Sequence, residues 1–74
     1  MSYYERVPRA QIVELVGRAH SEGTATLEIA WDDRDAWVDA LYERAESVAG
    51  DMCAIAVTGE DLPSSYKLSV TWCA

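Results

Sequence analysis

Three aspartates lie close together at Asp32, Asp33 and Asp35, directly after an apolar segment that ends at Trp31. Clustered carboxylates can hold Mg²⁺ or act as general bases. The sequence has no Gly-rich phosphate loop and no paired nucleophile and base to share such work. We therefore interpret these acids as helix caps and partners of a helix dipole. We predict a protein that is not an enzyme and uses no metal or other cofactor, with a metal-dependent enzyme as the third alternative.

The other residues with reactive side chains are His20, Cys53 and Cys73. His20 comes near the end of a predicted helix, where an imidazole interacts favourably with the helix dipole, and no Cys-x-x-Cys or His-x-x-x-His motif accompanies it. In the predicted strands, Cys53 has the parity of the side that faces the helices, whereas Cys73 has the parity of the opposite side. Because their Cβ atoms then point apart, we predict two unpaired thiols in a reducing compartment.

A longer acidic pattern extends from residue 32 to residue 46. At about 100° per residue, its acids fall within an arc of about 80° on one side of a helix, and an apolar set falls on the opposite side. The acids of this predicted stripe are Asp32, Asp35, Asp39, Glu43 and Glu46. The apolar set is Trp37, Val38, Leu41, Ala45 and Val48. Glu60 and Asp61, in a predicted hairpin loop, are candidates to extend the acidic surface.

Solubility alone does not explain why all charges of this stripe are negative. Amphipathic helices ordinarily have a solvated polar face, but acids four residues apart, as at Asp35, Asp39 and Glu43, repel each other by a few tenths of a kcal/mol per pair. The stripe spans roughly 21 Å of helix, over which one DNA strand places about six phosphates. Five carboxylates approach that density, so the pattern favours a surface complementary to a basic groove.

Composition and charge exclude other classes of protein. The 74 residues carry 13 acids and 6 bases, a net charge of −7, and half of them are hydrophobic. Ten acids and two bases lie between residues 28 and 61, a net of −8, which argues against direct nucleic-acid binding. The sequence has no apolar run long enough to span a membrane, and residues 1–6 lack a signal-peptide pattern. We expect a single domain over 1–74 in the cytoplasm.

Five elements are predicted to position these residues. Helical spacing over 8–21 and 33–49 predicts two amphipathic helices, and alternation over 24–31, 52–58 and 66–72 predicts three strands, with a turn over 59–64. The order αβαββ indicates an α+β domain with a split βαβ sheet of three strands and both helices on one face. The last strand is expected between the first two, with direct pairing of the first two as the alternative. The other face is expected to be solvated or to meet a partner. It carries Thr24, Thr26, Glu28, Lys67, Ser69 and Thr71.

In length, acidity and lack of a catalytic motif, the chain resembles the small anti-CRISPR inhibitors encoded by phages. The resemblance implies a stoichiometric inhibitor that blocks DNA binding by a Cas complex through an acidic surface, in the host cytoplasm. The same features are shared by immunity proteins, antitoxins and other DNA mimics. The alternative is a small interaction or oligomerisation module, monomer or weak homodimer, that docks through its open sheet face.

Overall fold

The computed structural model describes residues 7–50 and 52–73; residues 1–6, for which we predict no signal peptide, lie outside this part. Two helices, α1 (Arg9–Glu22) and α2 (Arg34–Ala49), and three strands, β1 (Thr24–Ile29), β2 (Ile55–Asp61) and β3 (Tyr66–Trp72), follow in the predicted order αβαββ. Short 3-10 turns, η2 (Trp31–Asp33) and η3 (Met52–Ala54), flank α2. The α+β class is confirmed.

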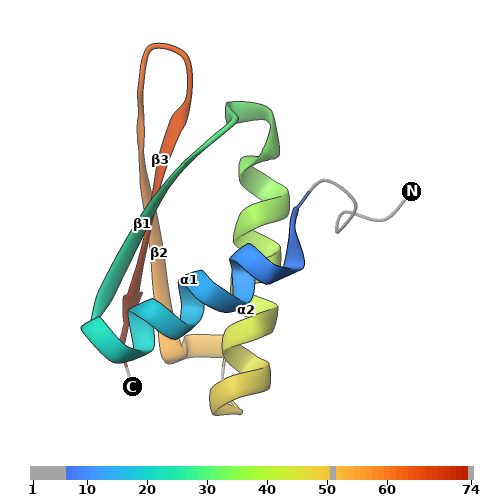
Figure 1. Ribbon diagram of the computed structural model, residues 1–74, viewed down its shortest axis with the longest axis vertical. Helices are drawn as coiled ribbons and strands as arrows, with labels where there is room; N and C mark the ends of the chain where they lie inside the picture. Colours follow the sequence, from blue (N-terminus) through green and yellow to red (C-terminus); the bar gives the residue numbers. More distant parts are fainter. Residues whose placement is uncertain (1–6, 51, 74) are drawn as a thin grey trace.

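The sheet has the order β1-β3-β2, and both of its pairings are antiparallel. The last strand therefore lies between the first two, as expected, and the alternative pairing of β1 with β2 is excluded. Since β1 and β2 each run opposite to β3, they run parallel to each other and are joined through α2 (Figure 1). This is the split βαβ arrangement.

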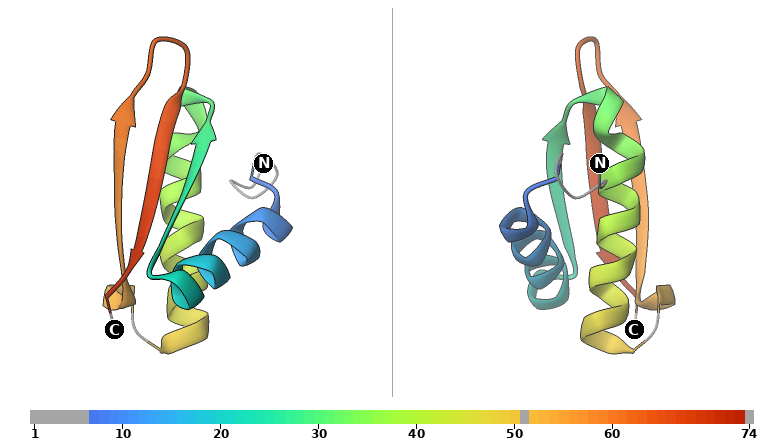
Figure 2. Two further views of the ribbon diagram at one scale, coloured as in Figure 1. Left: turned by 60° about the vertical axis from the view of Figure 1, so that its left-hand side comes forward. Right: turned by 90° about the vertical axis from the view of Figure 1, so that its right-hand side faces the viewer.

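Both helices pack on one face of the sheet, and the other face is left uncovered in the described part of the chain (Figure 2). Helix α1 contacts β1 and β3, whereas α2 contacts β2 and α1. The side chains of Val16, Leu41, Leu68 and Val70 are almost fully buried between these layers. Alternation in β1 and β3 predicted which residues face the helices: Ala25, Ile29, Leu68 and Val70 are all buried.

The buried side of α2 is rotated relative to the prediction. Ala36 and Ala40 are buried together with Trp37 and Leu41. Val48, which we expected in the core, lies on the same side of α2 but in its exposed last turn, and it is 47% exposed. The physical reason is that α2 packs on two neighbours. Ala40 lies beside residues of α1, so the buried arc extends toward that helix as well as over the sheet.

Several predicted element ends are wrong. Strand β1 ends at Ile29, so Trp31, expected on its core side, begins η2 instead and is 44% exposed. Strand β2 begins only at Ile55, and Cys53, expected to face the helices, is exposed in η3. The predicted helix end at Gly50 is confirmed: Gly50 has φ 75°, and its N–H donates to the carbonyl oxygen of Glu46 at 2.7 Å.

Candidate protein-binding surface

The acidic stripe, defined as Asp32, Asp35, Asp39, Glu43 and Glu46, is exposed along its whole length. Asp32 lies in η2 and the other four lie in α2. The buried residues of α2 fix its rotation, because Trp37, Leu41 and Ala45 are each at most 5% exposed. The core therefore sets the orientation of the stripe, and its five acids are exposed to solvent.

The start of α2 differs from the predicted cap. Asp33 occupies the N-cap position, but its side chain makes no capping hydrogen bond. The preceding turn η2 explains this, because its 3-10 bonds place Asp33 at φ −95° and ψ 0° rather than in the extended conformation that N-caps prefer. One acidic residue, Asp35, stands in the first turn of α2, where negative charge is favoured by the helix dipole.

The first acids of the stripe adjoin a cluster of aromatic and charged side chains. This Trp31 cluster consists of Trp31, Arg34, Asp61 and Tyr66. The indole Nε1–H of Trp31 donates to Asp61 Oδ1 at 2.8 Å. The guanidinium of Arg34 lies 4.4 Å from the centroid of the Trp31 ring and 5.7 Å from that of Tyr66, and the two rings meet edge to face at 6.1 Å.

The Trp31 cluster ties the β2–β3 hairpin to the start of α2. Trp31 and Arg34 come from η2 and α2, whereas Asp61 and Tyr66 come from the ends of β2 and β3. Arg34 also pairs with Asp35 of the stripe, with Nε 3.4 Å from Oδ1. The cluster is therefore continuous with the acidic stripe. It presents a half-exposed indole beside the carboxylates.

The two hairpin acids lie in β2 rather than in the predicted loop, and they separate to opposite faces of the sheet. Asp61 joins the Trp31 cluster and so adds a carboxylate next to the stripe. Glu60 has the opposite strand parity and is paired in register with Lys67, which is paired in turn with Glu28. Glu60 therefore belongs to the open sheet face and is not continuous with the stripe.

The open sheet face consists of three cross-strand rows. One row is Glu28, Lys67 and Glu60, the next is Thr26, Ser69 and Thr58, and the last is Thr24, Thr71 and Ala56. All of these side chains are exposed except that of Ser69, which is partly exposed. Apart from Ala56, these nine side chains are polar or charged, and none of the nine is aromatic, which distinguishes them from the surface around Trp31.

Sequence reasoning missed Trp31, Arg34 and Tyr66 as members of this surface. A usable signal was present, because Trp31 and Arg34 are three residues apart, the spacing that brings side chains together on a helical turn. Arg34 is also the single base within the acidic run 32–35. The partnership with Tyr66 and Asp61 carries no local signal, because those residues are about 30 positions away.

The remaining reactive side chains are those of His20, Cys53 and Cys73. His20 is in the last turn of α1 and packs edge to face on Trp72, with the ring centroids 4.6 Å apart. Cys53 and Cys73 are both exposed. Over 7–50 and 52–73, no three His, Cys, Asp or Glu side chains are grouped to hold a metal ion, so Asp32, Asp33 and Asp35 do not converge as ligands.

Comparison with known proteins identifies no relative: no family model, curated protein or solved structure matches the chain. In the described part of the chain, neither helix is both long and apolar enough to cross a membrane.

Proposed function

We propose that this protein is a stoichiometric inhibitor that binds a basic, nucleic-acid-binding protein through the acidic stripe and thereby occupies the site of the nucleic acid. The observation that carries the proposal is the exposure of five carboxylates on one side of η2 and α2. They extend over roughly 21 Å, a length comparable to about six phosphates of one DNA strand.

The electrostatics of the stripe support this reading over a merely solvated face. Asp35, Asp39 and Glu43 follow one another at four-residue spacing, and each like-charge pair costs stability. A helix shaped by stability alone would alternate acids with Lys or Arg. The two bases of α2 do not interrupt the row: Arg34 stacks on Trp31, and Arg44 lines a pocket with α1 residues.

The Trp31 cluster gives the surface an anchor that charge alone does not provide. Residues that dominate binding energy at protein interfaces are enriched in Trp, Tyr and Arg, whereas Ser and Thr are under-represented. The acidic stripe adjoins Trp31, Arg34 and Tyr66, and the open sheet face offers mainly Thr, Ser and charged side chains. This difference favours the stripe over the open sheet face as the interface.

The most concrete partner is a subunit of a Cas surveillance complex, by resemblance to anti-CRISPR inhibitors in size and acidity. Such a subunit holds nucleic acid in a positively charged channel and recognises its backbone, which is the property that a row of carboxylates can imitate. No cofactor takes part in this mechanism. The inhibitor acts by mass action, so inhibition saturates at a fixed ratio of inhibitor to complex.

The test is a competition assay in which a purified Cas surveillance complex binds fluorescent target DNA and the protein displaces it. We expect the double variant Asp39→Lys, Glu43→Lys to lose inhibition, because it replaces two central carboxylates with cations. Circular dichroism checks that its fold is intact. Inhibition by the wild type should weaken steeply with salt, because exposed charges are screened.

A charge-matched control separates the stripe from net charge. The double variant Glu14→Lys, Glu28→Lys also changes the net charge from −7 to −3, but Glu14 and Glu28 lie on α1 and on the open sheet face. It should inhibit as the wild type does. The proposal is overturned if the Asp39, Glu43 double variant inhibits as well as the wild type. It is also overturned if inhibition is lost only in the variant Ser69→Arg, at the centre of the open sheet face, because the interface would then lie on that face.

A further inference from the structure

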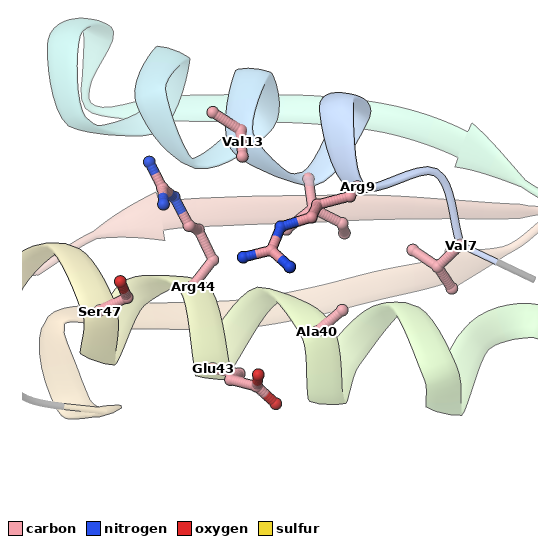
Figure 3. Close-up of a pocket in the computed structure, with 8 residues that line it drawn as sticks. Val7, Arg9, Val13, Ala40, Glu43, Arg44 and Ser47 are labelled. Atoms are coloured by element: carbon pink, nitrogen blue, oxygen red, sulfur yellow. The ribbon is translucent and has the colours of Figure 1, made fainter. Parts of the chain in front are cut away.

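A pocket lies between α1 and α2, on the side of α2 that packs against α1, and it is separate from the Trp31 cluster (Figure 3). Its volume is about 220 Å³. Apolar walls come from Val7, Val13 and Ala40, and polar groups come from Arg9, Arg44 and Ser47. Pockets that bind drug-sized molecules are usually larger, about 300–1,000 Å³, so this one fits a small molecule.

Two of the six basic residues of this acidic chain meet at the pocket. Arg9 comes from the first turn of α1 and Arg44 from the third turn of α2, and their guanidinium groups point into the space between the helices (Figure 3). Glu43 also lines the pocket, but its carboxylate points to the other side of α2 (Figure 3). The pocket is thus locally positive in a protein of net charge −7.

Arg44 is the more buried of the two arginines that line the pocket. Its Nε atom is buried, and it has no hydrogen-bond partner among the residues that the structure describes. Buried polar groups in folded proteins are nearly always hydrogen-bonded, and a buried donor on a charged group is especially costly to leave unsatisfied. A guanidinium presents its N–H donors as a planar fork that matches a carboxylate or phosphate.

We propose that this pocket binds a small organic carboxylate, with the carboxylate group between Arg9 and Arg44 and a short apolar chain against Val7, Val13 and Ala40. The apolar walls favour an organic acid over an inorganic anion, because they give binding energy only to a ligand that has carbon to bury. The pocket shares no residue with the Trp31 cluster. Ligand binding there does not depend on the proposed inhibitor function.

The experiment is a titration of the isotope-labelled full chain with sodium pentanoate, followed in ¹H–¹⁵N spectra that include the Arg Nε–H signals. We expect saturable shifts of the Arg44 Nε–H and of the Val13 and Ala40 amides. Arg9→Gln and Arg44→Gln should each weaken binding at least tenfold, because each removes one charged donor. Arg18→Gln, on the same helix as Arg9 but outside this pocket, should bind within twofold of wild type.

Two further probes separate charge from apolar contact. Pentanamide keeps the chain but lacks the negative charge, and inorganic phosphate has the charge but lacks the chain; both should bind at least tenfold more weakly than pentanoate. The proposal is overturned if pentanoate gives no saturable shift at tens of millimolar, if either probe binds as well as pentanoate, or if Arg9→Gln binds like wild type. Arg9 is exposed, so Arg9→Gln should fold like the wild type. It therefore still tests the proposal if Arg44→Gln destabilises the fold.

Discussion

Reversing one charge in the middle of the acidic stripe should make the protein more stable. Asp39 has Asp35 four residues before it and Glu43 four residues after it, and all three side chains are exposed on α2. The substitution Asp39→Lys converts two like-charge pairs into two opposite-charge pairs. If the repulsion between the stripe acids lowers the stability of the protein, then removing that repulsion must increase the free energy of unfolding.

The size of the gain follows from the spacing. Each repulsive pair costs, and each attractive pair contributes, about 0.2–0.5 kcal/mol, so the change of two pairs sums to about 0.8–2 kcal/mol. Only the pair of Asp35 with Lys at position 39 has the acid on the N-terminal side, which is the better orientation, so the lower half of the range is expected. A gain of about 1 kcal/mol raises the Tm of a domain of this size by about 4–8 °C.

The assay is thermal and urea unfolding followed by circular dichroism at low ionic strength and again at about 1 M NaCl, where the Debye length falls to about 3 Å and the gain should shrink. Glu14→Lys on α1 is the matched control, because it makes the same change in net charge but faces Arg18 at four-residue spacing. It should be neutral or slightly destabilising. Equal gains in both variants, or a loss in Asp39→Lys, would refute the argument that the local pattern costs stability.

Two other substitutions test the packing, and a third tests the contribution of Trp31 to inhibition. Leu68→Ala removes a fully buried side chain of the central strand, so we expect a loss of about 2–5 kcal/mol, measured by urea unfolding. Gly59→Ala places a Cβ atom against the ring of Tyr66, so we expect a loss of about 1 kcal/mol in the free energy of unfolding. This loss should vanish in a Tyr66→Ala background. If the effects of the two substitutions are additive in a double-mutant cycle, the two residues are not in contact. Trp31→Ala should weaken inhibition at least tenfold while changing stability by less than about 1 kcal/mol; unchanged inhibition would remove Trp31 as an anchor.

Local periodicity was sufficient for the architecture. Within the strands, alternation predicted the buried residues Ala25, Ile29, Leu68 and Val70, although it failed at Trp31 and Cys53 beyond the strand ends. The order αβαββ restricted the sheet to a few topologies, and the observed order β1-β3-β2 is one of them. The exposure of Asp35, Asp39 and Glu43 also followed from sequence, because a helix that buries Trp37 and Leu41 must turn those positions to solvent.

Features made by segments that are distant in sequence could not be predicted from local periodicity. The packing of α1 on α2 rotated the buried arc to Ala36 and Ala40 and set Arg9 beside Arg44. Asp61 and Tyr66 of the β2–β3 hairpin contact Trp31. Alternation alone had predicted Trp31 in the core.

The physical reason is that periodicity reports which side of one element is apolar, whereas contacts between elements depend on how those elements cross. Periodicity was therefore enough to predict a small acidic α+β domain with an exposed row of carboxylates on its second helix. The crossing of the elements placed the Trp31 cluster at one end of that row and the pocket with two arginines between the helices.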